Sequence, residues 1–364
     1  MALRFILFFL LLVPLWGENV RALSFERKDL RPLPGMPDGV IPLGVRLDSN
    51  GLYYLSLPPQ AGLWHLDPQG VLRELTDGPG QGPRQSNTLL GADVDEQGRV
   101  LTLSHFPGKR MVFARGPKGW CCEREERLPG VPPGLFAFWG RGGQWLLVEP
   151  ALNGREHGPD TPVLQLMKGA QPVRTLLTYG ELLAPLVPQE EVRDFLYFNK
   201  AGNPNIICAR SGHLFFLAWS LSPEILVFDL ERGTRRALDG RGPQWARFQI
   251  SPELEALRKK DPRRHQMGVL EQNVSLDQIY AGLDHMLVEW RIPGSGEASS
   301  EWVCLNGSGK VLGYSTFAPR KGDELVSAAY EGSKRILHLL RENGEEGWTL
   351  ERYRVSWPGA PDLP

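Results

Sequence analysis

The densest set of polar side chains that could carry chemistry lies in one stretch of the chain, residues 149–160. This stretch supplies carboxylates, an amide, a guanidinium and an imidazole: Glu149, Asn153, Arg155, Glu156, His157 and Asp160. Carboxylate and amide oxygens are the ligands that calcium prefers in proteins. We therefore treat the whole set as a candidate binding site, with Glu149, Asn153 and Asp160 as candidate metal ligands. The sequence identifies no catalytic residue.

A second stretch, Asp93–Leu103, begins like a calcium loop, because Asp93 and Asp95 alternate and Gly98 follows. A calcium loop of the EF-hand type also needs a bidentate glutamate at its twelfth position, where this chain has Ser104. In the matching stretch near residue 50, Arg46 stands in place of Asp93. We expect Asp95 to accept hydrogen bonds from its own backbone and Gly98 to adopt a turn conformation.

The elements that must position these side chains recur along the chain. An apolar run led by a turn residue appears six times, after Gly51, Gly98, Gly143, Gly212, Asp284 and Ser333. A shorter run precedes each of these and a second hairpin follows, which gives four short strands per unit. Six units of this kind predict an all-β fold, a six-bladed β-propeller of four-stranded antiparallel blades with small helical insertions. A β-sandwich or two smaller β domains is the alternative.

The sixth unit lacks its fourth strand, and a spare strand-like run at residues 23–31 can complete it. Such pairing would close the ring and cover an edge that would otherwise be free to aggregate. We expect one propeller domain over residues 23–364, with blades at about 40–77, 88–128, 134–178, 204–238, 277–316 and 323–356, the last completed by residues 23–31.

In its strands and turns, the stretch DVDEQGRVLTL followed by KRMVFARGPKG resembles the six-bladed propellers of the broad NHL, TolB-like and gluconolactonase-like group. The resemblance covers nearly all of the chain after residue 22. Gluconolactonase-like propellers hold a calcium ion at the mouth of the central channel, where it can polarise a lactone carbonyl. The resemblance therefore implies one alternative function, a calcium-dependent hydrolase or lactonase with its site at that mouth.

Long loops fall on one face of the predicted disc, at residues 149–162, 177–204 and 239–278, while the turns on the other face are short. Functional residues concentrate on loops held by a rigid scaffold, so this loop-rich face is the candidate binding face. Its later loops add further candidates: Arg193, Asp194, Trp245 and, beyond Ala246, Arg247.

Two of these loops are expected to contain helices. Ser251 can cap a helix whose first residue is Pro252. The earlier insertion offers apolar side chains for packing onto the disc: Leu182, Leu183, Leu186, Val192 and Phe195. The basic cluster at residues 258–265 could meet an anionic partner, or it could be a solvated surface.

Cysteines, histidines and glycosylation sequons add smaller expectations. The predicted strands keep Cys208, Cys304 and the neighbouring pair Cys121 and Cys122 too far apart for bridges between blades. We expect mostly reduced, buried thiols, with a Cys121–Cys122 bridge as the one alternative. His213 and His285 occupy equivalent places after a turn, which favours a structural role. Asn273 and Asn306 lie in glycosylation sequons.

The amino-terminal segment has the pattern of a secretory signal peptide. Arg4 precedes an apolar run over residues 5–16, and Ala22 suits a cleavage site. We therefore expect residues 1–22 to be removed, leaving a secreted or periplasmic protein without a transmembrane anchor. The net charge of −1, from 41 basic and 42 acidic residues, gives no warrant for a nucleic-acid partner.

Together these observations predict an exported, monomeric and non-enzymatic β-propeller without a cofactor. We expect it to bind a protein, a peptide or a glycan on its loop-rich face. The hydrolase or lactonase, with calcium as its cofactor, is the alternative.

Overall fold

The computed structural model describes most of the chain after residue 21. The described residues are 22–33, 44–47, 53–57, 62–67, 71–78, 80–86, 89–95, 97–104, 108–117, 119–128, 136–139, 143–149, 157–199, 206–258, 260–282, 284–293, 300–317, 324–343 and 347–361. The expected signal peptide, apart from Ala22, and the candidate residues Asn153, Arg155 and Glu156 lie outside them.

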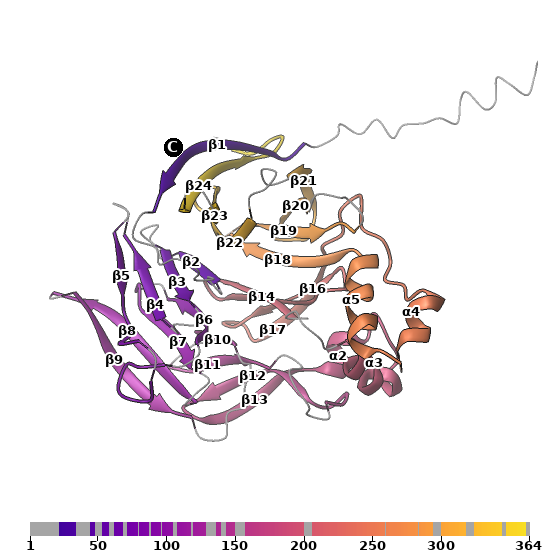
Figure 1. The fold of residues 1–364 in the computed structure, drawn as a ribbon, viewed down its shortest axis with the longest axis horizontal. Coiled ribbons are helices and arrows are strands. Elements are labelled where there is room, and N and C mark those ends of the chain that lie inside the picture. Colours follow the sequence, from indigo (N-terminus) through magenta and orange to yellow (C-terminus); the bar gives the residue numbers. More distant parts are fainter. Residues whose placement is uncertain are drawn as a thin grey trace, which may run out of the picture.

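The described strands form six four-stranded antiparallel sheets (Figure 1). Sheet 1 contains β2 Gly44–Leu47, β3 Tyr53–Leu57, β4 Gly62–Leu66 and β5 Leu72–Glu74. Sheet 2 contains β6 Leu89–Val94, β7 Val100–Ser104, β8 Lys109–Gly116 and β9 Gly119–Arg127. Sheet 3 contains β10 Phe136–Trp139, β11 Trp145–Val148, β12 Pro162–Lys168 and β13 Gln171–Thr178.

The remaining sheets follow the same order along the chain, except that the last one recruits the first strand. Sheet 4 contains β14 Ile206–Ser211, β15 Leu214–Trp219, β16 Glu224–Asp229 and β17 Thr234–Asp239. Sheet 5 contains β18 Ser275–Ala281, β19 His285–Arg291, β20 Ser300–Asn306 and β21 Val311–Phe317. Sheet 6 contains β22 Glu324–Glu331, β23 Ile336–Asn343, β24 Gly347–Ser356 and β1 Ser24–Pro32.

The sheets are arranged around a common centre (Figure 1). The innermost strands, one from each sheet, are β2, β6, β10, β14, β18 and β22. Strand β2 contacts both β6 and β22, β6 contacts β10, and β18 contacts both β14 and β22. Sheets 3 and 4 are joined by a shared cluster of buried hydrophobic side chains. Radially packed, four-stranded antiparallel sheets of this kind define the β-propeller fold.

Strand β1 covers the outer edge of sheet 6. It pairs antiparallel with β24 from Ser24 opposite Ser356 to Pro32 opposite Thr349. Just before it, Leu23 is buried and its backbone N–H donates to the Tyr314 carbonyl of sheet 5 at 2.9 Å. The edge strand of sheet 6 is therefore supplied by the other end of the chain.

The stretch that resembles a calcium loop is a hairpin turn between β6 and β7. Asp95 Oδ1 accepts the backbone N–H groups of Gln97 and Arg99 at 2.9 and 2.8 Å. Gly98 has φ +74°, a conformation that residues with a Cβ rarely adopt. These observations confirm the predicted turn chemistry of Asp95 and Gly98.

The hydrophobic core lies between neighbouring sheets, where apolar faces of the middle strands meet. Every residue of β7 and β11 is buried, whereas the outer strand β9 is mostly exposed or half-buried. Four tryptophans are among the largest fully buried side chains: Trp145, Trp219, Trp290 and Trp302. Burial of aromatic side chains on this scale is a main source of stability.

Helices occupy two connections between sheets. The connection from β13 to β14 contains α2 Tyr179–Leu183, η1 Gln189–Glu191 and α3 Val192–Asn199, and the one from β17 to β18 contains α4 Pro252–Leu257 and α5 Pro262–Gln272. Ser251 Oγ accepts the Leu254 N–H at 3.3 Å, which confirms the predicted cap. Because Asp261 caps a separate helix, the basic cluster is split between the end of α4 and the start of α5.

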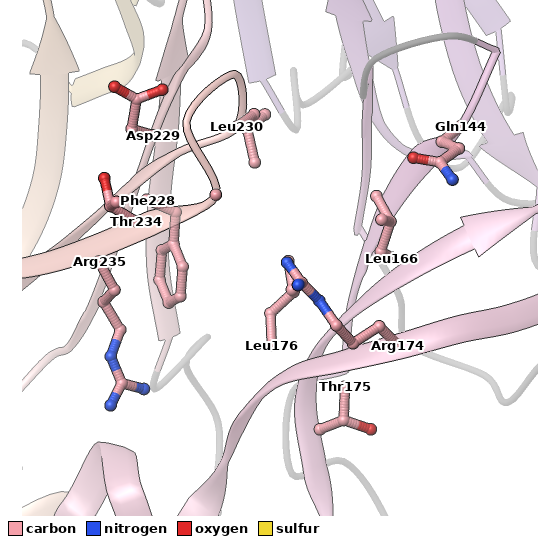
Figure 2. A pocket seen from close by; sticks show the side chains of 11 residues that line it. Gln144, Leu166, Arg174, Thr175, Leu176, Phe228, Asp229, Leu230, Thr234 and Arg235 are labelled. Carbon is pink, nitrogen blue, oxygen red and sulfur yellow. The ribbon is translucent and has the colours of Figure 1, made fainter.

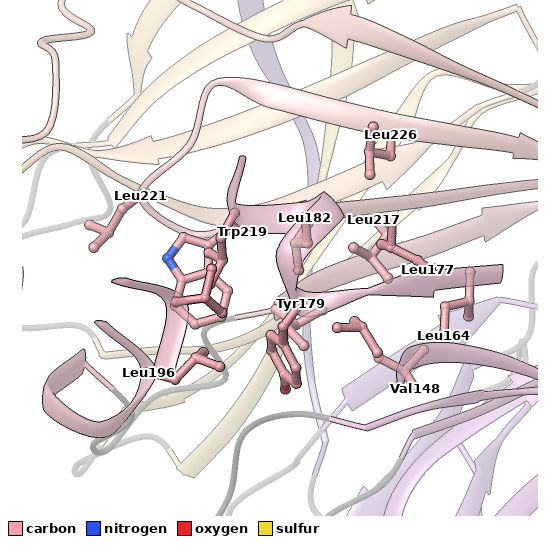
Figure 3. Close-up of a cluster of buried hydrophobic side chains, with 14 of the residues drawn as sticks. Val148, Leu164, Leu177, Tyr179, Leu182, Leu196, Leu217, Trp219, Leu221 and Leu226 are labelled. Carbon is pink, nitrogen blue, oxygen red and sulfur yellow. The ribbon is translucent and has the colours of Figure 1, made fainter. Parts of the chain in front are cut away.

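The two insertions pack together and onto the sheets, in one hydrophobic cluster with sheets 3 and 4. Figure 3 shows Tyr179, Leu182 and Leu196 gathered beside Leu217 and Trp219 of β15. The same cluster contains Leu254 of α4 and Val269 of α5. The predicted apolar set is confirmed in this role: Leu182, Leu183, Val192 and Phe195 are buried in the cluster, and Leu186 packs against it. We call α2, η1, α3, α4 and α5 together the insertion layer.

The predicted equivalence of two histidines is wrong. In sheet 4 the pairing of β15 with β16 begins with Leu214 opposite Asp229, and in sheet 5 the pairing of β19 with β20 begins with His285 opposite Asn306. His285 therefore occupies the position of Leu214 and not that of His213. An offset of one residue in a strand places the side chain on the other face. Consistently, His213 is largely exposed, while His285 is buried between Asp284, at 2.6 Å, and the Tyr330 hydroxyl, at 2.5 Å.

All four cysteines carry free thiols. Cys304 is buried, Cys122 and Cys208 are half-buried, and Cys121 is exposed. The expectation of mostly buried thiols is therefore confirmed in full only for Cys304, and Cys121 is exposed on the outer strand β9.

Candidate functional site

Residues 157–161, at the end of the loop that carries the first candidate residues, contact the start of α2. The Tyr179 hydroxyl donates to the Glu149 carbonyl at 2.7 Å, and the His157 ring lies 5.5 Å from the Tyr179 ring, measured between centroids. Tyr179 is fully buried, and burial, with a further contribution from the nearby Glu149 carboxylate, raises the pKa of its hydroxyl well above the usual value. The structure therefore brings Glu149 and His157 together around Tyr179.

Backbone contacts fix the position of this loop on the helix. Gly180 N–H donates to the Pro159 carbonyl at 2.8 Å, and Tyr179 N–H donates to the Thr161 carbonyl at 3.0 Å. Thr178 and Glu181 form a capping box at the start of α2. A Cβ at Gly180 would lie only 3.0 Å from the Pro159 carbonyl, so glycine permits this close approach. As a result the candidate carboxylate of Asp160 is held at an exposed loop tip.

Arg193 and Asp194 lie next to this loop, on the exposed side of α3. The Arg193 guanidinium reaches towards the loop, because a Cβ at Gly158 would lie 3.7 Å from its Nη2. Asp194 Oδ2 lies 3.8 Å from Arg258 Nη2 and so links α3 to the end of α4. Arg193 therefore lies beside the loop, whereas Asp194 faces the end of α4.

Trp245 and Arg247 belong to a different place. Trp245 is half-buried and packs against the core between sheets 4 and 5, with the Arg241 guanidinium 5.5 Å above its ring. Its loop is tied to sheet 5, where the Gln244 N–H donates to the Glu301 carboxylate at 3.2 Å. Arg247 is exposed. The sequence-predicted set is therefore divided into two groups.

The predicted metal site stays a prediction, because the structure describes only two of its three candidate ligands. In that part of the chain, no three His, Cys, Asp or Glu side chains are close enough together to hold a metal ion. Glu149 and Asp160 are described, whereas the third candidate ligand, Asn153, is not.

A pair of acidic residues that sequence reasoning missed lies at the start of sheet 5. Glu289 is buried in β19, where it accepts a hydrogen bond from the Tyr280 hydroxyl at 2.9 Å. Burial and the neighbouring Asp277 raise the pKa of Glu289 to about 7. Asp277 lies at an irregularity of β18, and the residue is exposed to solvent. Its carboxyl group is nevertheless surrounded by protein, and this burial raises its pKa as well. The available signal was a glutamate inside the apolar run HMLVEW.

The exposed side of the insertion layer carries unneutralised positive charge. Arg263 and Arg264 are exposed on α5 beside Met267, a large apolar residue that is 54% exposed. Among the described residues no acidic group lies within ion-pair distance of Arg263 or Arg264, whereas Arg258 is engaged by Glu255 and Asp194. This part of the surface can attract an anionic partner.

Comparison with known proteins gives the fold class and nothing finer. No family model matches the chain, and no curated protein matches it by sequence. A solved protein from Bacteroides fragilis NCTC 9343, named as an exported protein, is similar at 10% identity and a TM-score of 0.60, covering 93% of this chain and 96% of its own. A PQQ-bound aldose sugar dehydrogenase from Streptomyces coelicolor is similar at 13% identity and a TM-score of 0.52, covering 92% and 98%.

A lyase is also among the similar structures. Virginiamycin B lyase from Staphylococcus aureus has 10% identity and a TM-score of 0.47, with 91% of this chain and 99% of the lyase covered. At identities this low, the exported protein and the sugar dehydrogenase, with TM-scores above 0.5, show the fold alone. The chain is a β-propeller. In its described part, no helix combines the length and apolar character required to cross a membrane.

Proposed function

We propose that the chain is an exported, non-enzymatic, six-bladed β-propeller of the NHL or TolB-like kind that binds an anionic protein, peptide or glycan. The insertion layer is its contact surface. The proposal of six blades in a closed ring is supported by the six sheets, by the contacts between their innermost strands and by the pairing of β1 with β24.

One observation carries the binding proposal. Two insertions that are far apart in the sequence share a single buried cluster with sheets 3 and 4, so they form a rigid platform and not two independent loops. A platform of this kind can present Arg193, Arg263, Arg264 and Met267 in fixed relative positions. Rigid presentation lowers the entropy cost of binding.

The test compares charge reversals on and away from the platform. The full chain is screened against acidic peptides and anionic glycans, and each binder is measured again with Arg263→Glu and with the control Arg124→Glu, an exposed arginine on β9. We expect Arg263→Glu to weaken binding, with a stronger effect at low salt, and the control to leave it unchanged. Binders that both variants retain equally would overturn the proposal. Sequencing of the released protein's amino terminus tests export separately, with Leu23 expected first.

The calcium-dependent hydrolase or lactonase at the channel mouth stays the alternative, and a second candidate, a hydrolase that uses acid–base chemistry, draws its support from Asp277 and Glu289. Two neighbouring carboxyl groups with raised pKa values, one open to solvent and one buried behind it, are a common arrangement for general acid–base chemistry. A panel of lactones and esters tests this reading. Hydrolysis that Asp277→Asn abolishes would favour the enzyme, and hydrolysis that the variant leaves unchanged would exclude this site.

A further inference from the structure

A cavity of about 300 Å³ lies between the outer strands of sheets 3 and 4 (Figure 2). It is bounded by β12 and β13 on one side and by β16, β17 and their connecting turn on the other. The cavity is open to solvent and uses none of the exposed residues of the insertion layer. We call it the Arg174 groove.

The floor of the groove is apolar. Leu166 and Leu176 from sheet 3 and Leu230 from sheet 4 line it, and all three are half-buried side chains that pack against the core cluster. Phe228 lies behind them and is 5% exposed. The groove therefore keeps apolar surface in contact with water, and an apolar ligand group could cover that surface.

The wall of the groove is cationic. Figure 2 shows the Arg174 guanidinium extended from β13 towards sheet 4, over Leu176. No acidic side chain among the described residues lies within ion-pair distance of Arg174. The second arginine, Arg235, is paired with Glu181 at 3.0 Å, which leaves Arg174 as the unneutralised charge.

The one carboxylate along the groove belongs to Asp229, and it is held elsewhere. Its Oδ1 accepts the backbone N–H groups of Glu231 and Arg232 at 3.0 and 2.9 Å, and its Oδ2 lies 3.9 Å from His213 Nε2. In Figure 2 the Asp229 carboxylate points away from Arg174. The groove thus combines a positive group with an apolar floor, without an internal counter-charge at Arg174.

From this arrangement we propose that the Arg174 groove binds a small amphipathic carboxylate. The planar guanidinium of Arg174 offers two parallel donors that match the two oxygens of a carboxylate. The apolar body of the ligand lies on Leu166, Leu176 and Leu230. The volume of the groove limits the ligand to a small molecule. This site goes beyond the proposed partner-binding surface and does not depend on it.

The experiment uses hexanoate as the probe, titrated into the full chain by isothermal titration calorimetry, with hexanol and inorganic phosphate as comparison ligands. We expect hexanoate to bind in the millimolar range, since few groups contribute. Arg174→Gln is expected to weaken hexanoate binding by about tenfold.

The matched control is Arg236→Gln, because Arg236 lies next to Arg235 on β17 but lines the separate cavity beside His213. This variant is expected to bind hexanoate as the native chain does. Comparable binding of hexanol would show that Arg174 is not used, and comparable binding of phosphate would show that the apolar floor is not used. Either result, an absence of hexanoate binding, or equal losses in both variants would overturn the proposal.

Discussion

Arg210 and Asp93 form an ion pair, with 2.7 Å between Arg210 Nε and Asp93 Oδ2, although sheet 3 separates their two sheets in the chain order. Both side chains are largely buried, 10% and 6% exposed. Arg210 also donates to the carbonyls of Val94 and Gly212, and Asp93 accepts the Trp139 N–H at 2.8 Å. The innermost strands of sheets 2, 3 and 4 are therefore tied together by one charged group.

Removing the arginine should destabilise the packing of sheets 2, 3 and 4. Arg210→Met leaves the Asp93 carboxylate buried without its counter-charge, and we expect the free energy of unfolding to fall by about 3 kcal/mol. Chemical denaturation measures the change. Combining it with Asp93→Asn should restore part of the loss, because the amide still accepts the Trp139 N–H. A stability of Arg210→Met equal to that of the native chain would contradict this account.

Glu289 should make the protein less stable as the pH rises. Its folded pKa of about 7 lies above the unfolded value, so the folded state holds a proton that the unfolded state releases between these values. Stability is therefore lost as the pH rises from about 4.5 through about 7. The facing groups are Asp277, Tyr280 and Ser300, with Arg291 near Asp277.

The variant Glu289→Gln removes the titrating proton. We expect it to flatten this part of the profile and to gain a few kcal/mol of stability above neutral pH. Urea unfolding midpoints across the range measure it. An unchanged slope in the variant would show that Glu289 is not the group responsible.

His338 should act in the opposite direction. It is buried in sheet 6, and burial together with the nearby Arg352 guanidinium lowers its pKa to about 3, although Glu331 Oε2 lies 3.6 Å from its Nε2. Between about pH 3 and about pH 6.5 the unfolded state binds a proton that the folded state does not, so stability rises with pH in this window. Asp29, which pairs with Arg352, partly offsets the effect.

Replacing this histidine should weaken acid denaturation. His338→Gln is expected to reduce the dependence of the unfolding midpoint on pH below about 6.5, and the exposed His213→Gln serves as the control. Equal profiles for the native chain and His338→Gln would refute the assignment.

Asn273 should be structural and should not carry a glycan. It is 6% exposed, its Nδ2 donates to the carbonyls of Gln249 and Val269 at 2.9 and 2.8 Å, and its Oδ1 accepts the Gln249 N–H at 2.9 Å. A glycan on Nδ2 is incompatible with these bonds. Mass spectrometry of the folded protein from a glycosylating host should find Asn273 unmodified.

The same bonds predict a stability effect. Asn273→Ala leaves backbone groups of Gln249 and Val269 unpaired, and we expect a loss of about 3 kcal/mol in unfolding free energy. In the control Asn306→Ala, the lost acceptor at the end of β20 served the backbone N–H groups of the exposed residues Ser308 and Lys310, which water can reach, so the variant should cost about 1 kcal/mol. Equal losses in the two variants would contradict the structural role of Asn273.

Much of the fold could be predicted because its signals are local. A turn residue followed by an apolar run marks each hairpin, and Asp95 with Gly98 shows why: the carboxylate bonds its own backbone and the glycine adopts the positive φ. The described strands form six sheets, and the run near residue 23 pairs with β24. The register of the strands was harder to predict, since a shift of one residue separates His213 from the position that His285 occupies in its own sheet.

The candidate site could be predicted from the sequence only in part. Glu149 and His157 were named because the polar residues are dense in sequence, and they do meet around Tyr179. Trp245, chosen from a neighbouring loop, packs between sheets 4 and 5 instead. Asp277 was missed because an irregularity in β18, which no residue type announces, places it beside Glu289.

The sequence by itself determined the repeating hairpins, the all-β class and the positions of the insertions, because turn chemistry and strand alternation depend on residues close together in the chain. Only the tertiary structure decided that Arg210 meets Asp93, that the two insertions share one core and that Arg174 faces an apolar groove. Each of these contacts joins different sheets or insertions, so it depends on the radial packing of the sheets, where a one-residue change of register would turn the side chain away.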